Sequence, residues 1–263
     1  TSHTWQFTVQ TTPAAAEFVL STNAAVQSTP RGVALGDVNG DGNLDVVVAN
    51  YGSNSISVRL GDGAGNLSGA VNVAVQTQPS IVALGDVNGD GNLDIAAINY
   101  GSNSISIRLG NGTGGFGGAT DIAVSPSPSD ITLGDVNGDG RLDIIASNYT
   151  SGEVSIRLGN GVGGFSSATN VAVQNQPYAA ALGDINNDGN LDVAAVNSSS
   201  ASVSIRLGDG AGNLTGITNV AVQTQPYGIA LGDVNGDGYI DMAVANFGSN
   251  SVSIRLGNGS GGF

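Results

Sequence analysis

Short apolar runs alternate with stretches rich in glycine, asparagine and serine along almost the whole chain. Residues 104–107 read Ser-Ile-Ser-Ile, the two-residue alternation of a strand with one buried face. Residues 95–98 read Ile-Ala-Ala-Ile, and an unbroken apolar run in a strand indicates burial on both faces of its sheet. In this part of the chain the pattern predicts four strands, at 81–85, 93–99, 104–109 and 119–124.

The same pattern returns at a fixed interval. A Gly-Asp-Val/Ile-Asn string places its aspartate at Asp37, Asp86, Asp135, Asp184 and Asp233, a step of 49 residues each time. The same step separates the arginines of five Arg-Leu-Gly strings and the asparagines after each second strand: Arg59, Arg108, Arg157, Arg206, Arg255, Asn50, Asn99, Asn148, Asn197 and Asn246. A four-stranded unit of about 40 to 50 residues is typical of a propeller blade, and about four to eight blades make a ring. The sequence therefore predicts an all-β fold, a five-bladed β-propeller of four-stranded blades.

The repeats occupy residues 18–263, which we expect to form one domain. The chain enters the repeat with a predicted fourth strand near 19–27 and leaves it after a third strand at 253–256. Pairing of these two strands would complete the last blade, close the ring and remove two exposed sheet edges. We therefore expect the N-terminal strand to close the propeller.

Residues 1–17 stand outside the period. Residues 4–9 alternate like one strand, and residues 11–16 read as a linker of threonine, proline and alanine. Two interpretations stay open for this N-terminal segment. It is the last strand of a preceding Ig-like domain, or it is a tail that is disordered or packs on the propeller.

Each copy contains the string Asp-x-Asn-x-Asp-Gly-x-x-Asp between its first and second strands. Calcium prefers about six to eight oxygen ligands, and side chains at positions 1, 3 and 5 of a tight loop turn toward one point. The glycine at position 6 permits the positive φ of the bend. Three carboxylates within one short loop repel one another strongly unless a cation lies between them. The alternative is an aspartate-rich turn held only by local hydrogen bonds.

The last carboxylate of the string stands at position 9, so the loop differs from an EF-hand, and we expect a strand-loop-strand site with one Ca²⁺ per copy, five in all. Position 7 contributes its backbone carbonyl, which leaves its side chain free to vary. In the fourth copy Asn187 replaces the glycine at position 4, which makes that loop the weakest match. The predicted metal residues are Asp37, Asn39, Asp41, Asn43, Asp45, Asp86, Asn88, Asp90, Asn92, Asp94, Asp135, Asn137, Asp139, Arg141, Asp143, Asp184, Asn186, Asp188, Asn190, Asp192, Asp233, Asn235, Asp237, Tyr239 and Asp241.

The formal charge of −14 follows from these loops, which hold 15 of the 21 acidic residues. Five bound divalent ions would bring the charge from −14 to −4. All seven basic residues are arginines and none of them cluster, so a nucleic-acid partner is disfavoured. No apolar run approaches the ~20 residues of a membrane span, and no signal peptide is visible at Thr1.

The stretch from Val33 to Asp45, together with the Arg-Leu-Gly-Asn-Gly-Thr-Gly-Gly-Phe string at 108–116, resembles the FG-GAP/VCBS repeats of integrin α-chain propellers, bacterial surface proteins and some fungal lectins. The resemblance covers residues 19–263. It implies calcium ligands at loop positions 1, 3, 5 and 9 and a secreted or cell-surface location, where calcium near millimolar would fill even weak sites. Relatives more often have six to eight blades.

Aromatic residues next to amides recur in the turns opposite the metal loops, a combination that suits stacking on a sugar ring. The candidate ligand-binding residues are Tyr51, Tyr100, Tyr149, Tyr178, Tyr227 and Phe247. The alternative is that these side chains form turns and pack blades. The periodic arginines are expected to span neighbouring blades and donate to carbonyl or carboxylate oxygens, the alternative being an anion site.

These observations favour a non-catalytic, monomeric, calcium-binding module of adhesion or ligand binding, with a glycan or a protein as partner on the face opposite the metal loops. One alternative is a structural spacer within a larger surface protein. A polysaccharide-acting enzyme is a further alternative, although no acid, base or nucleophile departs from the repeat to form a catalytic constellation.

Overall fold

The computed structural model describes residues 23–166 and 169–263, and these residues form five antiparallel sheets. We call the sheets blades 1 to 5 in chain order. Blade 1 contains β1 (Pro30–Gly36), β2 (Asp45–Asn50), β3 (Ser55–Gly61) and β4 (Leu67–Ala74). Blade 2 contains β5 (Pro79–Gly85), β6 (Asp94–Asn99), β7 (Ser104–Gly110) and β8 (Phe116–Ala123), and blade 3 contains β9 (Pro128–Gly134), β10 (Asp143–Asn148), β11 (Glu153–Arg157) and β12 (Thr169–Ala172). Blade 4 contains β13 (Pro177–Gly183), β14 (Asp192–Asn197), β15 (Ser202–Gly208) and β16 (Leu214–Ala221), and blade 5 contains β17 (Pro226–Gly232), β18 (Asp241–Asn246) and β19 (Ser251–Arg255).

The all-β fold and the five blades predicted from the period are confirmed. The one helical element described is a single 3₁₀ turn, η1 (Phe247–Ser249), and the described part of the chain has no helix long and apolar enough to cross a membrane. The fourth strand of blade 2 begins three residues earlier than predicted. The reason is a bulge between Ile107 and Leu109, which lets the glycine-rich segment at Phe116–Gly117 pair with the end of β7.

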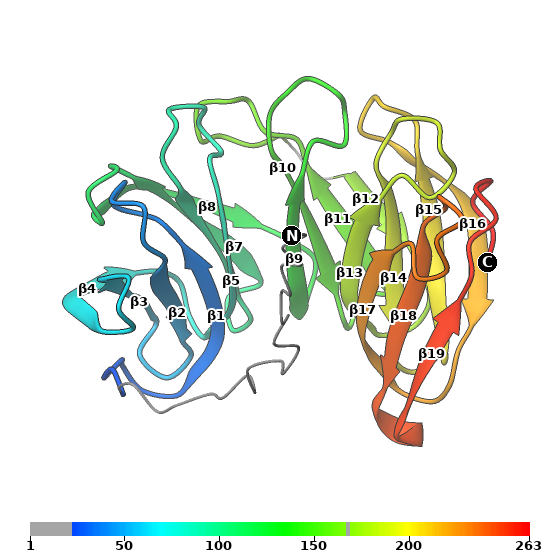
Figure 1. The fold of residues 1–263 in the computed structure, drawn as a ribbon, viewed down its shortest axis with the longest axis horizontal. Coiled ribbons are helices and arrows are strands. Elements are labelled where there is room, and N and C mark those ends of the chain that lie inside the picture. Colours follow the sequence, from blue (N-terminus) through cyan, green and yellow to red (C-terminus); the bar gives the residue numbers. More distant parts are fainter. Residues whose placement is uncertain (1–22, 167–168) are drawn as a thin grey trace, which may run out of the picture.

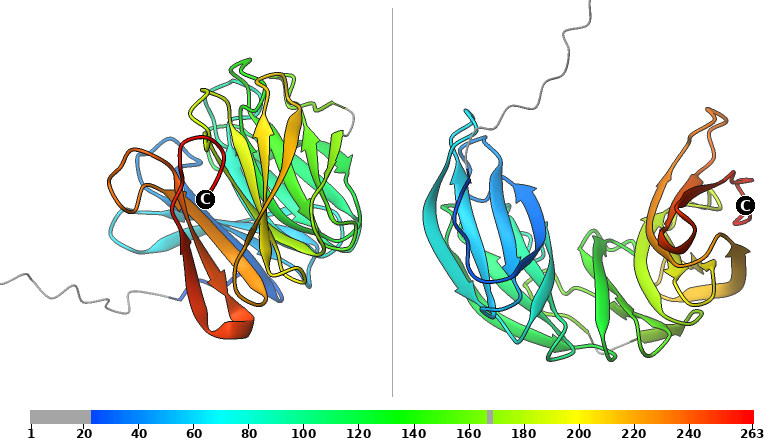
Figure 2. Two further views of the ribbon diagram at one scale, coloured as in Figure 1. Left: turned by 90° about the vertical axis from the view of Figure 1, so that its right-hand side faces the viewer. Right: turned by 90° about the horizontal axis from the view of Figure 1, so that it is seen from below.

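The blades stand around an open arc (Figure 1). The first strands β1, β5, β9, β13 and β17 neighbour one another along its inner side. A gap separates blade 1 from blade 5. The view from below shows the open arc with these two blades at its ends (Figure 2).

Closure of the ring stays a prediction. Within residues 23–166 and 169–263, no fourth strand pairs with β19, and residues 23–27 form no strand. The start of the predicted N-terminal strand, residues 19–22, lies outside the described residues, as does the segment 1–17.

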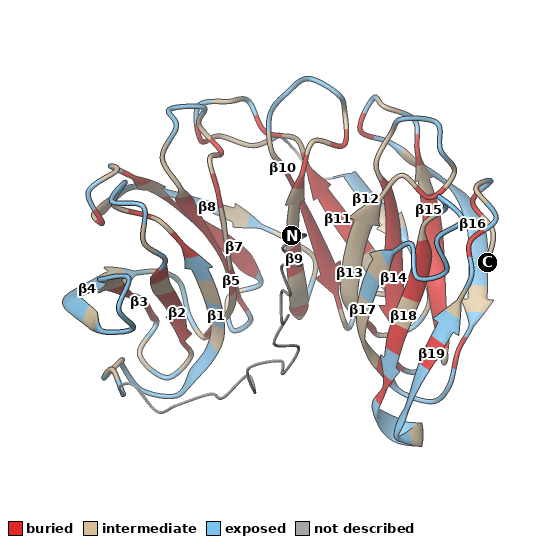
Figure 3. Ribbon diagram, viewed as in Figure 1, coloured by how far each residue is buried: buried red, intermediate tan, exposed pale blue. Residues whose placement is uncertain are grey.

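Apolar side chains fill the spaces between neighbouring blades. Between blades 1 and 2, for example, Ile56 and Val58 of β3 pack with Val82 of β5 and Ile95 of β6. In blades 1 to 4 the second and third strands are buried over most of their length, whereas the outer fourth strands are largely exposed (Figure 3). In blade 5 the third strand, β19, is itself mostly exposed. Burial on both faces explains why β6 is apolar without interruption.

Four of the five periodic arginines connect neighbouring blades, as predicted, and Arg59 connects blade 1 to Ala25 of the segment that precedes it. Arg206 donates from Nε and Nη2 to the main-chain oxygen of Ala172, the last residue of β12 in the preceding blade, at 3.1 and 2.9 Å. The acceptors are Ala25, Ala74, Ala123, Ala172 and Ala221 for Arg59, Arg108, Arg157, Arg206 and Arg255 in turn. Each arginine therefore fixes one blade to the outer strand segment before it.

Replacing Arg206 by methionine is expected to lower the free energy of unfolding by about 2 kcal/mol, because hydrogen bonds from a buried, charged donor to main-chain carbonyls are lost. Urea denaturation measures the change. Arg141→Met is the matched control: Arg141 lies on the surface of the third metal loop, and its loss should change stability by less than about 0.5 kcal/mol. Equal effects of the two substitutions would contradict the role of Arg206 as an inter-blade link.

Asp130 adds a polar link that the other junctions lack. Its Oδ2 accepts a hydrogen bond from the Ala180 amide of β13 at 2.9 Å, and Thr132 donates to the carbonyl of the same residue at 3.2 Å. The corresponding positions in the other blades hold Gly32, Ile81, Ala179 and Gly228. Burial raises the pKa of the Asp130 carboxyl to about 6, against the opposing effect of the Ala180 and Ile131 amides.

Because the pKa of Asp130 is higher in the folded state than in the unfolded state, the folded state binds the proton more tightly than the unfolded state does. The stability supplied by this group is full below about pH 4 and is lost as the pH rises through 6. The change in unfolding free energy caused by Asp130→Asn should therefore be more favourable at pH 7 than at pH 4, by about 1 to 2 kcal/mol. Partial exposure of the carboxyl keeps this difference below the full value of the pKa shift. Comparing the variant with the parent at both pH values cancels the titration of the metal loops. A difference that does not change with pH would contradict this assignment.

Candidate metal loops and ligand-binding face

The acidic loops connect the first strand of each blade to the second. The glycine at position 6 has the positive φ that the sequence predicted, 84° at Gly42 and 80° to 89° in the other four copies. In the fourth copy Asn187 adopts φ 59° at position 4, where the others have glycine. Asparagine tolerates this left-handed conformation better than most residues, so the fourth loop keeps the same turn.

The position 1 aspartate is surrounded by main-chain donors. Asp37 Oδ2 accepts from the Gly42 amide at 2.7 Å, and Oδ1 accepts from the Gly40 amide at 2.7 Å. These donors, that of Gly42 above all, hold the pKa of the Asp37 carboxyl below its ordinary value. The loop therefore carries an ionised carboxylate at position 1.

Positions 3 and 5 continue the same turn. In the second copy Asn88 Nδ2 donates to Asp90 Oδ2 at 2.9 Å, and Asp90 Oδ1 accepts from the Asn92 amide at 2.8 Å. The Asn92 amide is the main cause of a lowered pKa at Asp90. The side chain at position 7 lies beside a glycine of the loop between the third and fourth strands, Gly112 in this copy.

The position 9 aspartate is buried and joins two loops. Asp94 Oδ2 accepts from the Val87 amide at 2.9 Å, and Oδ1 accepts from the Gly110 amide at the end of β7 at 2.8 Å. Burial raises the pKa of Asp94, and the charges of Asp90 and Asp86 raise it further. The same two hydrogen bonds recur in every copy, at Asp45, Asp94, Asp143, Asp192 and Asp241.

Gly110 has no room for a side chain. A Cβ there would lie 2.2 Å from the main-chain oxygen of Leu93, and the equivalent glycines of the other blades meet the same carbonyl at 2.0 to 2.2 Å. This close approach brings the Gly110 amide within reach of the buried Asp94 carboxylate.

In residues 23–166 and 169–263, no three acidic or histidine side chains converge as a preassembled metal cluster. The loop carboxylates are directed at main-chain amides. The side chains at positions 1, 3, 5 and 9 nevertheless all offer carboxylate or amide oxygens, the donors that Ca²⁺ prefers. At position 9 each oxygen of Asp94 accepts one amide hydrogen and keeps a lone pair for a further partner, whereas Asp37 Oδ1 accepts from three amides. The donor set therefore fits a hard divalent cation.

Four of the six candidate ligand-binding residues lie together at the end of the blades opposite the metal loops. Tyr178 stacks on Tyr227 with ring centroids 4.3 Å apart, Tyr227 stacks on Phe247 at 5.2 Å, and Tyr149 meets Tyr178 edge-on at 6.4 Å. We call these four residues the aromatic row. Tyr51 lies outside it, with Arg31 Cζ 3.5 Å above its ring centroid, and Tyr100 is an exposed residue of blade 2.

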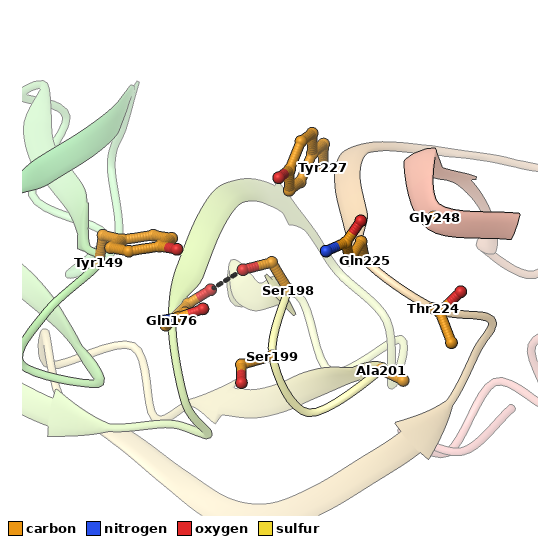
Figure 4. A pocket seen from close by; sticks show the side chains of 9 residues that line it. All are labelled: Tyr149, Gln176, Ser198, Ser199, Ala201, Thr224, Gln225, Tyr227 and Gly248. Atoms are coloured by element: carbon orange, nitrogen blue, oxygen red, sulfur yellow. Dashed lines mark hydrogen bonds between the residues drawn. The ribbon is translucent and has the colours of Figure 1, made fainter. Parts of the chain in front are cut away.

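A hollow of about 480 Å³ opens beside the aromatic row, between Tyr149 and Tyr227 (Figure 4). Four blades place an aromatic residue directly after the buried asparagine that ends the second strand, whereas blade 4 has Ser198 there. Ser198 donates to the main-chain oxygen of Gln176 at 3.0 Å, and both residues line the hollow. The small side chain therefore leaves space that an aromatic ring would fill.

The model of the FG-GAP-like repeat family matches residues 37–97, 86–146, 135–195 and 184–244, which together cover most of the chain. The chain belongs to this family. None of the curated proteins compared with this FG-GAP-like chain is significantly similar to it.

Solved structures with the same fold differ widely in function. A lectin of Agrocybe aegerita, described as recognising non-reducing terminal N-acetylglucosamine, is 21% identical with a TM-score of 0.62, over 89% of this chain and 65% of the lectin. A putative 6-phosphogluconolactonase of Bacteroides fragilis is 20% identical with a TM-score of 0.64, over 82% of this chain and 65% of that one. The V. cholerae biofilm matrix protein Bap1 is 21% identical with a TM-score of 0.50, over 89% of this chain and 38% of Bap1. The FG-GAP-like chain thus spans about two thirds of the lectin and of the lactonase.

Sequence reasoning did not single out the polar residues that line the hollow, Gln176, Ser198, Ser199, Thr224 and Gln225. A signal was present, because Ser198 interrupts an otherwise aromatic position of the FG-GAP-like repeats. A side chain that departs from a near-identical repeat marks an asymmetric place on the arc.

Proposed function

We propose that the chain is an extracellular, calcium-stabilised, non-catalytic propeller module that binds a ligand on the face opposite its metal loops. The observation that carries the calcium part is the fivefold recurrence of one oxygen-rich loop, in which aspartates at positions 1 and 5 share a turn with a buried aspartate at position 9. One Ca²⁺ would be held by the side chains at positions 1, 3, 5 and 9 and the carbonyl of position 7 in each copy. The ion would supply the positive charge that offsets the repulsion among these carboxylates.

Counting bound metal tests this part directly. Mass-spectrometric metal analysis after equilibration in millimolar calcium and removal of free ion should find five Ca²⁺ per chain. A variant with Asp86→Asn and Asp90→Asn should lose one ion while keeping the far-ultraviolet circular dichroism of the parent. A parent chain that holds no calcium would contradict the proposal.

The described acidic residues outside the loops support a non-catalytic role, and one of them, Asp130, accepts the Ala180 amide at the junction of blades 3 and 4. Asp121 accepts from Arg108 at 3.2 Å and from Ser106 at 2.6 Å, and Glu153 accepts from Ser125 at 2.8 Å. Asp62 and Asp209 accept amide hydrogens of their own loops, at Ala64 and Ala211. These carboxylates have structural partners, and none forms the acid and base pair that hydrolysis of a polysaccharide requires. New reducing ends or unsaturated products from acidic polysaccharides would overturn this reading.

The hollow next to the aromatic row favours a sugar as the ligand. Tyrosine rings and a lining of amide and hydroxyl groups suit the apolar face and the hydroxyls of a pyranose. Structural similarity to a lectin and to a biofilm matrix protein accords with a role in binding glycans or in adhesion. A module that served only as a spacer would not require this asymmetric hollow.

Screening the calcium-loaded chain on a glycan array tests the ligand, and Ser198→Phe sharpens the test. The substitution restores the aromatic residue of the other blades and should fill the hollow, so binding should fall at least tenfold while the melting temperature changes little. Tyr100→Phe in blade 2, outside the aromatic row, is the control that should keep binding. A parent chain that binds no glycan on the array would remove the sugar from the proposal but leave the calcium sites intact.

A further inference from the structure

Blade 5 exposes an apolar face that every earlier blade buries. Val252 and Ile254 of β19 are 64% and 46% exposed, whereas their counterparts one repeat earlier, Val203 and Ile205, are 0% and 1% exposed. Burial in blade 4 is due to blade 5 itself, because Val203 and Ile205 pack with Met242 and Val244. The far face of blade 5 has the same kind of side chains, and no blade formed by residues 23–166 and 169–263 packs against it.

Blade 1 exposes the complementary face at the other end of the arc. Val33 of β1 is 65% exposed, and its counterpart Val82 in blade 2 is 6% exposed because it packs on blade 1. Leu35 and Leu44 beside Val33 are exposed as well. The arc therefore carries both halves of the junction that joins its own blades, one half at each end (Figures 1 and 2).

Residues 23–27 already lie where the outer strand of a preceding blade would end. Arg59 Nε donates to the Ala25 oxygen at 2.9 Å, as Arg108 donates to Ala74 at 3.0 Å. Ser55 donates to Gln27 Oε1 at 2.7 Å, as Ser202 donates to Gln174 Oε1 at 2.6 Å. The inter-blade contacts of an outer strand are thus present in front of blade 1, although the described part of the chain supplies no inner strands for such a blade.

The occupant of the two end faces must present the apolar pattern of this repeat. A blade that docks on blade 5 needs residues like Val82 and Ile95, and one that docks in front of blade 1 needs residues like Ile56 and Val58. The junctions between the five described blades use the same positions, and they leave blade 1 and blade 5 apart (Figure 1). About a third of the lectin and of the lactonase lies outside the part that matches the arc.

We propose that the two end faces form one docking surface for two further blades of the same 49-residue repeat, which bridge blade 5 to blade 1. Whole repeats keep residues 23–27 in register as the outer segment of the bridging blade next to blade 1. This docking surface is separate from the metal loops and from the hollow. Docking of further blades does not depend on whether those sites bind their ligands.

The chain contains no cysteine, so single cysteines are clean probes of the two faces. Ile254→Cys reports on the blade 5 face, Val33→Cys on the blade 1 face, and Ile217→Cys, 86% exposed on the outer strand β16, is the matched control. Each variant is made in the chain itself and in a chain extended after Phe263 by a copy of residues 117–214, which are two further repeats in frame. The rate of reaction with a thiol reagent is measured at several protein concentrations.

We expect fast labelling of all three cysteines in the unextended chain, and in the extended chain at least a tenfold slower reaction at positions 254 and 33 with no change at 217. Protection of both faces in the unextended chain at every concentration would show a ring that closes on itself and would overturn the proposal. Protection that grows with concentration would assign the faces to a second copy and would also overturn it. Unchanged labelling in the extended chain, or protection of one face only, would exclude a bridge of repeats.

Discussion

Removal of calcium is expected to lower the melting temperature of the chain by about 20 °C or more. An ion that binds only the folded loop stabilises it by about 2.7 kcal/mol when its concentration is 100 times the dissociation constant. Five such loops supply an amount comparable to the whole free energy of unfolding of a domain, about 5 to 15 kcal/mol. For a chain of this size about 1 kcal/mol corresponds to roughly 2 to 4 °C. Calorimetry in excess chelator and in millimolar calcium measures the difference.

Two controls separate bound calcium from general effects of salt. Magnesium at the same concentration should restore much less of the stability, because it demands near-ideal octahedral geometry and gives up its waters reluctantly. The variant with Asp86→Asn and Asp90→Asn should show about a fifth less response to calcium than the parent. Identical melting curves in chelator and in calcium would mean that the loops are stabilised by their hydrogen bonds alone.

Gly110→Ala is expected to destabilise the chain by about 3 to 5 kcal/mol, the largest effect of any single methyl group considered. The added Cβ would overlap the Leu93 carbonyl, so β7 must move away from the loop. That movement would break the hydrogen bond from Gly110 to Asp94 and leave a buried carboxylate without one of its two donors. Urea denaturation in calcium should show the loss, and metal analysis should show one ion fewer.

Gly117→Ala in the same blade is the matched control. Nothing lies within 4 Å of a Cβ at Gly117, and its backbone does not have a positive φ. The substitution should change stability by less than about 1 kcal/mol. Equal effects of the two alanines would show that the cost arises from glycine flexibility and not from the close approach at Gly110.

The repeat explains why so much of the fold could be predicted. A side chain such as Arg206 that returns in every copy must serve the contact between copies, and its hydrogen bond to the preceding blade confirms this. Apolar continuity at residues 95–98 correctly indicated burial on both faces of β6.

Features that depend on the third dimension were not predictable in the same way. The sequence shows that Asp94 belongs to the loop, but not that both its oxygens accept amides from two different segments. It placed six candidate aromatic residues in the turns opposite the metal loops, but it does not show that stacking unites four of them and that Arg31 lies over the ring of Tyr51. Arc curvature depends on small rotations between blades, and a fixed period of 49 residues contains no information on their size.

The stacked rings of Tyr178, Tyr227 and Phe247 make one half of the molecule optically distinct. Coupled aromatic chromophores at this separation give near-ultraviolet circular dichroism that depends on blades 4 and 5 staying together, while the far-ultraviolet signal averages all blades. Following both bands during denaturation would show whether the repeats unfold as one unit or in succession, as quasi-one-dimensional proteins can. The protein thus carries its own local reporter of cooperativity, without an added dye.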